Sequence, residues 1–176
     1  MEEKYLRQLG IGVASLTFGV ALSIFILAVY AGFVNSLQTT LLYLASFLLM
    51  LRFWWRYTEL FVQFLPSRNF WQFLFDFAIS FFGIIAVVFI GNIQTWTIIG
   101  AGAMIASIIR SGLSWKYAKN KNVKKSLKNT IIGALGVLVL FSLVYALTPF
   151  VDNLILAGSV FVLVLLFVIY ASVKKK

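Results

Sequence analysis

The residues most able to do chemistry in this 176-residue sequence are ionisable side chains embedded in two apolar stretches. Arg52, Arg56 and Glu59 fall on one face of a helix, which turns by about 100° per residue. In the next stretch Asp76 and Ser80 lie four residues apart, so they share a helix face as well. A guanidinium and a carboxylate that meet away from water form charge-assisted hydrogen bonds, which offset much of the cost of burial. The pattern therefore predicts a charged network between two helices.

The proline between the two stretches indicates how the network is paired. A hairpin folded at this proline brings Asp76 level with Arg56, and Ser80 level with Arg52. Glu59 lies three residues after Arg56, a spacing at which side chains on one helix form ion pairs. The predicted buried or half-buried network consists of Arg52, Arg56, Glu59, Asp76 and Ser80.

Two interpretations of this network remain open. It is either a structural clasp between two helices or part of a path for an ion, a proton or a solute. The clasp is favoured because the network lies toward one end of the helices and contains two arginines beside two acids. Arg52 is the best candidate for a functional role, since it lies deepest and its level neighbour is only Ser80.

Residues that other chemistries need are missing from the sequence. It contains no histidine and no cysteine, which removes the commonest metal ligand, thiolate chemistry and disulfide bonds together. It also has no glycine-rich loop that could cradle a phosphate group. We therefore expect no catalytic residues, no metal site and no cofactor, and we expect that the protein is not an enzyme.

The elements that must position the network are transmembrane helices. Hydrophobic residues make up 62% of the chain and charged residues 11%, whereas soluble chains carry about a quarter charged residues. A spanning helix needs about 20 mostly apolar residues, and six stretches approach this length. We expect an all-α, polytopic integral membrane protein that forms a single transmembrane domain over residues 1–176. The expected spans are 9–30, 41–64, 70–90, 93–109, 130–147 and 150–173, with a basic cytoplasmic loop at 110–129.

Basic residues lie on one side of this six-span arrangement. The formal net charge is +10, yet the connections at 31–40, 91–92 and 148–149 contain no Lys or Arg. Because cytoplasmic loops carry the excess of Lys and Arg, we expect both termini in the cytoplasm and the protein in the cell membrane. Nucleic-acid binding is not expected, since most aromatic residues lie inside the apolar spans. Contact with anionic lipid headgroups is expected for Lys116, Lys119, Lys121, Lys124, Lys125 and Lys128.

Small residues recur at four-residue spacing in two of the expected spans. Ser15, Gly19 and Ser23 form one row in the first span, and Gly102 and Ala106 form another in the fourth. Rows of this kind allow helices to approach closely within a bilayer. We expect them to be packing faces, either inside the monomer or between protomers of a homo-oligomer or a complex with another membrane protein.

Two functional hypotheses follow from these features. The first is an oligomeric ion channel or small-solute transporter, whose path is lined by the polar faces of the second and third spans. The alternative is a non-catalytic membrane subunit or scaffold that docks partners through helix faces and the basic cytoplasmic loop. Transport is slightly favoured, because two aligned polar faces are more than membrane insertion requires.

Overall fold

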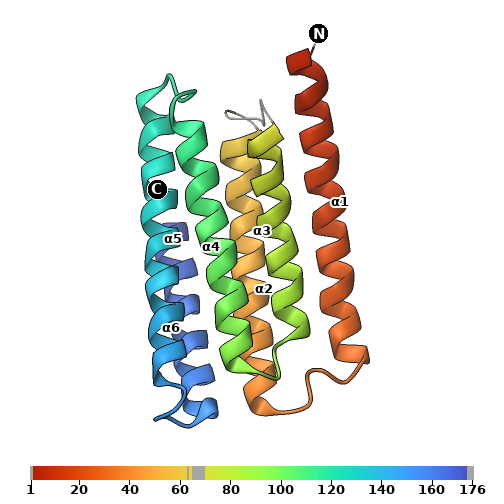
Figure 1. The fold of residues 1–176 in the computed structure, drawn as a ribbon, viewed down its shortest axis with the longest axis vertical. Helices are drawn as coiled ribbons and strands as arrows, with labels where there is room; N and C mark the ends of the chain where they lie inside the picture. Colours follow the sequence, from red (N-terminus) through yellow and green to blue (C-terminus); the bar gives the residue numbers. More distant parts are fainter. Residues whose placement is uncertain (1, 63, 65–69, 174–176) are drawn as a thin grey trace.

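The computed structural model describes residues 2–62, 64 and 70–173. Side chains are described for these residues except 2–7, 9–11, 13–14, 17, 62 and 171–173. The described residues form six α-helices and one π-helical turn, which run up and down a single bundle (Figure 1). The elements are α1 (Glu2–Tyr30), α2 (Leu37–Tyr57), the π turn η1 (Thr58–Val62), α3 (Phe70–Val88), α4 (Ile93–Trp115), α5 (Lys121–Leu147) and α6 (Asn153–Val173).

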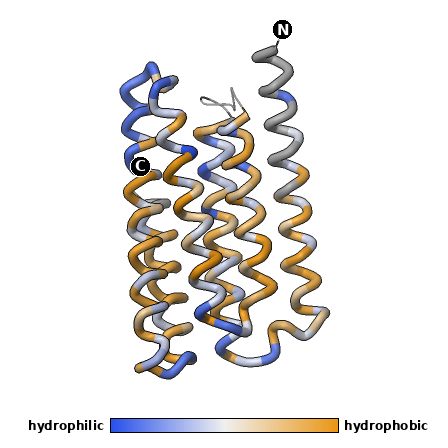
Figure 2. The backbone as a smooth tube through the Cα atoms, viewed as in Figure 1, coloured by the Kyte–Doolittle hydropathy of each residue, from blue (hydrophilic) through white to orange (hydrophobic). Residues whose placement is uncertain are grey.

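The helices have the length and composition that a bilayer requires. In the described part of the chain, five helices are long and apolar enough to cross a membrane, namely α2 to α6. The apolar part of α1 whose side chains are described, Phe18–Tyr30, is shorter than a full span. Figure 2 shows apolar residues along the middle of the bundle and hydrophilic residues at the helix connections. The fold is a helical membrane bundle, as expected from the sequence.

Polar residues define where several helices begin. The Ser36 hydroxyl accepts a hydrogen bond from the Thr39 backbone N–H, and the Thr39 hydroxyl accepts one from the Ser36 N–H, a reciprocal cap for α2. Asn92 caps α4 by accepting from the Thr95 N–H at 3.0 Å, and Asn120 caps α5. These caps satisfy backbone donors that hydrocarbon could not, so they lie in the connections between spans.

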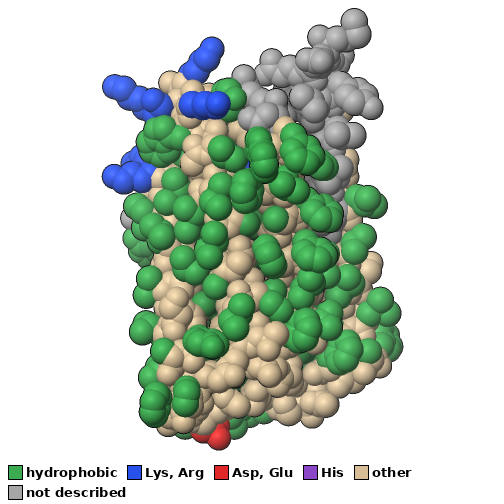
Figure 3. Space-filling view, viewed as in Figure 1, with side chains coloured by type: hydrophobic (Ala, Val, Ile, Leu, Met, Phe, Trp, Pro, Cys, Tyr) green, Lys and Arg blue, Asp and Glu red, His purple; other side chains and the backbone are tan. Residues whose placement is uncertain are grey.

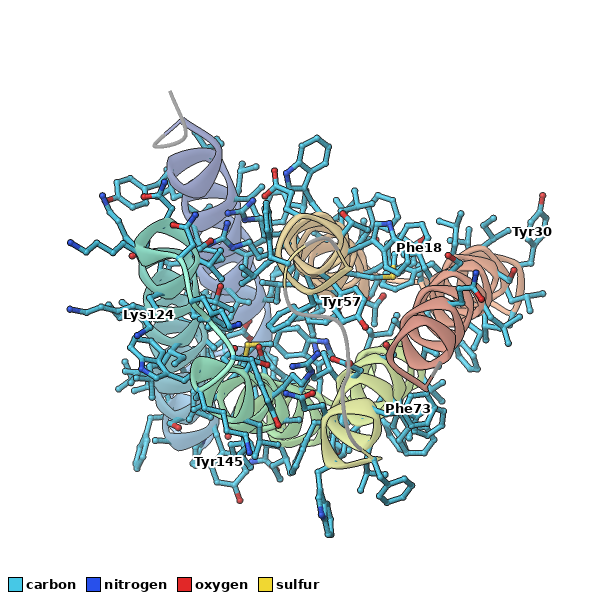
Figure 4. The ribbon with its side chains drawn as sticks, turned by 90° about the horizontal axis from the view of Figure 1, so that it is seen from above. Phe18, Tyr30, Tyr57, Phe73, Lys124 and Tyr145 are labelled. Carbon is cyan, nitrogen blue, oxygen red and sulfur yellow. The ribbon has the colours of Figure 1, made fainter. Side chains whose placement is uncertain are left out.

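The bundle has two layers, which are seen end-on in Figure 4. One layer is the row α3, α4, α5, in which α4 packs extensively on both neighbours. The other layer pairs α2 with α6, while α1 lies at one edge against α3. Aromatic side chains also join α1 to α2, because the rings of Phe18 and Trp54 stack with their centroids 4.4 Å apart. The expected α2–α3 hairpin is therefore only a minor contact, since each helix packs mainly on a different partner.

Two apolar clusters occupy opposite halves of the bundle. The larger cluster contains residues from each of the helices α2 to α6. It includes Trp96, whose indole N–H donates to the Ser46 hydroxyl at 2.8 Å. The smaller cluster lies beside the α4–α5 connection and includes Tyr57, Phe61 and Leu127. The interior of the bundle is therefore packed with apolar residues toward both of its ends.

Charge is separated between the two ends of the bundle. Lysine side chains gather at the end formed by the α4–α5 connection, which we call the basic end (Figure 3). The opposite end carries Asp152 in the α5–α6 connection, beside the connections at 31–36 and 91–92. The one-sided charge of the sequence thus becomes a charged end and a nearly neutral end.

The two rows of small residues lie in different surroundings. Gly102 faces Phe82 of α3, and Ala106 is buried, so the α4 row packs inside the monomer. Ser15, Gly19 and Ser23 are exposed on α1, where the Ser23 hydroxyl donates to the Gly19 carbonyl at 2.9 Å. The α1 row is therefore on the outer surface of the bundle.

Candidate functional site

Polar and charged side chains from four helices meet in the interior near the basic end. They come from α2, α3, α4 and α5, with one acid contributed by the π turn η1. We call this group the polar layer. It consists of Arg56, Glu59, Gln72, Asp76, Arg110, Ser111, Ser114, Ser126 and Thr130.

Arg110 of α4 and Asp76 of α3 form the central ion pair of the layer. The Arg110 Nε donates to Asp76 Oδ1 at 2.8 Å, and the two side chains are 0% and 10% exposed. Arg110 Nη1 also donates to the Ser114 hydroxyl, one turn further along α4. The ring of Phe61 covers the guanidinium, with its centroid 4.5 Å from Cζ. A buried charge is thus met by a carboxylate, a hydroxyl and an aromatic face.

The burial of Arg110 corrects the expected end of the fourth span. The sequence pattern ends this span at Ile109 and places Arg110 in the basic loop, whereas α4 continues to Trp115. The polar residues from 110 to 114 remain helical because they lie on the face that α4 buries against its neighbours. That face continues the buried small residues Ala103, Ala106 and Ser107 at helical spacing.

Arg56 links the helix layer of α2 and α6 to the helix layer of α3, α4 and α5. From α2, its Nη2 donates to the Ser126 carbonyl at 3.0 Å and to the Ser126 hydroxyl at 2.7 Å. Its Nε donates to the Thr130 hydroxyl at 3.3 Å, so all three bonds reach α5. Glu59 Oε2 lies 3.7 Å from Arg56 Nη1, which is the intrahelical ion pair expected from their spacing.

The predicted pairing of Arg56 with Asp76 is wrong. Depth matching in a hairpin assumes that sequence neighbours are also the main packing neighbours, and here α3 packs along α4. Asp76 therefore meets Arg110, and Arg56 turns toward α5. The Ser80 hydroxyl donates to the Asp76 carbonyl at 3.2 Å, so it bonds within its own helix. Arg52 is part-exposed on α2.

The π turn η1 sets the directions of the side chains that follow Arg56. In a π-helical turn the backbone bonds run from residue i to i+5, so residues five apart lie near the same face. Arg56 lies just before this turn and Phe61 lies within it, and the one reaches α5 while the other covers Arg110. Glu59 accepts from the Trp55 indole N–H at 2.7 Å. The hydropathy pattern carries no signal for this turn.

Several members of the polar layer were not found from the sequence. Arg110, Ser111, Ser114, Ser126 and Thr130 were assigned to the basic loop or to the start of the fifth span. The signal that could have found the three members on α4 is the continued spacing of small and polar residues beyond Ile109. Ser111 is fully buried, and its hydroxyl has no hydrogen-bond partner in the described part of the chain.

The segment expected to be a basic loop is largely helical. Because α5 begins at Lys121, residues 121–129 form its first turns rather than a solvated loop. Val123 and Leu127 are buried against the apolar cluster of the basic end, and the lysines of these turns are exposed. Lys124, labelled in Figure 4, points away from the bundle. Contact of these lysines with anionic headgroups stays a prediction.

A polar hollow lies at the opposite end of the bundle. It has a volume of about 280 Å³ and lies between the α3–α4 and α5–α6 connections. Gln94 Nε2 donates to the Thr148 hydroxyl at 2.8 Å across it. Its polar side chains are mostly exposed, which distinguishes it from the enclosed polar layer.

Comparisons of the chain with protein-family models, with curated proteins and with solved structures give no match in any of the three. The assignment therefore depends on the fold and the site. They define a multi-pass helical membrane protein that keeps ionisable groups and hydroxyls in its interior.

Proposed function

We propose that the protein is a small membrane transport protein, either an ion channel or a small-solute transporter, whose route passes through the polar layer. The observation that carries this proposal is the complete burial of Arg110 among polar groups drawn from several helices. Charged residues within membrane spans cost about 2.5–3.5 kcal/mol each on insertion scales, and they usually face an interior path. A single clasp between two helices would need one pair, whereas this layer also joins α2 to α5.

The proposed orientation follows the charge of the two ends. Cytoplasmic connections are enriched in Lys and Arg, so we assign the basic end and both termini to the cytoplasm of a cell membrane. In this orientation the polar layer lies toward the cytoplasmic side of the route. The hollow at the opposite end then faces the exterior.

A non-catalytic membrane subunit or scaffold is the second candidate. The exposed row of Ser15, Gly19 and Ser23 on α1 favours it, since small residues on an outer surface allow another helix to approach. In that case the polar layer is a clasp that holds α3 on α4 and α2 on α5. The same α1 surface also provides an oligomer contact for the transport hypothesis.

Flux measurements on purified protein in liposomes test the proposal. We expect the parent protein to conduct, and Asp76→Asn to change the rate at least tenfold because it alters the charge of the layer. Ser142→Ala is the matched control, since Ser142 is exposed on α5 and donates to the Leu138 carbonyl of its own helix. Helical content and elution volume show whether each variant is folded. An absence of flux for common cations, anions and neutral solutes would refute transport and favour the subunit.

A further inference from the structure

We infer that the transported solute is a small inorganic anion, of the class of chloride. This inference rests on the proposed transport function and assigns its substrate class.

The polar layer and the arginine next to it carry more positive than negative charge. Within the layer, Arg56 and Arg110 balance Glu59 and Asp76. Arg52, part-exposed on α2 one turn before Arg56, adds one positive charge beside the layer. Charges interact strongly in a low-dielectric interior, so this excess opposes a passing cation and attracts an anion.

Both acids of the interior are held by donor groups. Asp76 accepts from Arg110, and Glu59 accepts from Trp55 while lying 3.7 Å from an Arg56 nitrogen. A cation in the layer would need carboxylate or carbonyl oxygens in place of its hydration shell. It would have to compete with guanidinium groups for these two carboxylates. The layer is therefore a poor site for a cation.

Buried hydroxyl groups lie along one side of α4. Ser107, Ser111 and Ser114 are buried at four-residue and three-residue spacing, so they form a row that passes Arg110 and leads toward the middle of the bundle. The Ser114 hydroxyl donates to the Arg110 carbonyl at 3.0 Å, so Ser111 is the member of the row that matters for an anion. The Ser111 hydroxyl is completely buried and has no partner among the described residues. A buried hydroxyl normally has a partner, and this one can donate to an anion beside the guanidinium.

The basic end would concentrate anions at the entrance to this row. Exposed lysines from the α4–α5 connection and the first turns of α5 gather at this end of the bundle (Figure 3). A one-sign surface field raises the local concentration of counter-ions and their rate of entry. The connections of the opposite end at 31–36, 91–92 and 148–152 carry no Lys or Arg. The field therefore favours anion entry from the basic end.

The sign of the reversal potential across a planar bilayer with a KCl gradient tests the inference. We expect the current to reverse near the equilibrium potential of chloride, and Ser111→Ala to reduce chloride current several-fold. This variant should fold, because it removes a buried hydroxyl that lacks a partner. Ser142→Ala on the outer surface of α5 is the control and should conduct like the parent.

The outcomes separate the two proposals. Reversal near the equilibrium potential of potassium would overturn the anion assignment and leave the transport function standing. Chloride current that Ser111→Ala leaves unchanged would overturn the role of the α4 hydroxyl row. No current with any salt would overturn the transport function itself, and the anion assignment with it.

Discussion

Arg110 is the residue on which the interior of this protein depends. Its guanidinium is fully buried. In place of solvent it contacts the Asp76 carboxylate, the Ser114 hydroxyl and the ring of Phe61. Removing an ion from water costs several kcal/mol, and an ion pair offsets this cost only when its geometry is good. The 2.8 Å bond between Nε and Oδ1 provides such geometry. Removing one partner should therefore be worse than removing both.

We predict this order of stability for Arg110→Leu, Asp76→Leu and the double variant. Each single change leaves one buried charge without its partner, so the free energy of unfolding should fall by about 3–5 kcal/mol. The double variant leaves neither charge without a partner, so it should lose less than either single variant. Unfolding by SDS in mixed micelles, followed by circular dichroism, measures all three. Additive losses would show that the pair is not coupled.

At the scale of elements, the contact between α4 and α5 depends on the absence of a side chain at Gly100. A Cβ atom at this position would lie 2.5 Å from Cε2 of Phe141. Phe141 cannot easily move away, because it is buried and packs edge-on against Trp96 with ring centroids 5.1 Å apart. Glycine at position 100 therefore sets how closely the two helices approach.

We predict opposite effects for alanine at two glycines of α4. Gly100→Ala should lower the free energy of unfolding by about 1–3 kcal/mol, since it overpacks the contact with Phe141. Gly112→Ala should be neutral or stabilising by up to about 1 kcal/mol, because alanine is the better helix former and no atom lies within 4 Å. The same SDS titration compares them. Equal effects would mean that the α4–α5 contact is looser than described.

The π turn η1 is a second element with a measurable consequence. Its first residue, Thr58, donates its hydroxyl to the carbonyls of Trp54 and Trp55 at 3.2 and 2.9 Å. A π turn accommodates one extra residue without rotating the helix on either side of it. Deleting Thr58 should convert the turn to α-helix and leave the side chains on both sides of it facing the same neighbours.

We predict that deletion of Thr58 is tolerated and that deletion of Leu51 is not. Loss of Thr58 should cost about 1–2 kcal/mol for its hydrogen bonds. Loss of Leu51 rotates every later residue of the helix by about 100°, which moves Arg56 off α5 and Phe61 off Arg110. Thermal unfolding in detergent measures both variants. Comparable losses would show that η1 does not act as a one-residue insertion.

At the scale of the whole molecule, the separation of charge predicts the orientation in the membrane. The basic end contains the α4–α5 connection, and the opposite end contains the strongly exposed Phe150. The chain has no cysteine, so a single introduced thiol reports one position without further changes.

We predict that Phe150→Cys reacts with a membrane-impermeant maleimide in intact cells. Lys121→Cys should react only after the membrane is permeabilised, because the positive-inside rule places this end in the cytoplasm. Gel shifts of the labelled protein measure both reactions. Reaction of both positions in intact cells would contradict the assignment of the two ends to opposite sides.

The sequence by itself determined the helical membrane class and the one-sided distribution of charge. Both follow from local composition, because hydrocarbon demands long apolar helices and positive charge collects in particular connections. The Arg56–Glu59 contact was predictable as well, since both residues belong to one continuous helical segment and their spacing defines it.

Only the tertiary structure decided which helices are neighbours, and with that the membership of the polar layer. The chain order suggests that α2 packs on α3, whereas α2 packs mainly on α6, and α3 packs mainly on α4. Asp76 therefore meets Arg110, which hydropathy had placed outside the membrane. A buried charge depresses local hydropathy as strongly as an exposed one. Whether Arg110 ends a helix or is enclosed by it depends on partners from other helices, which no local pattern contains.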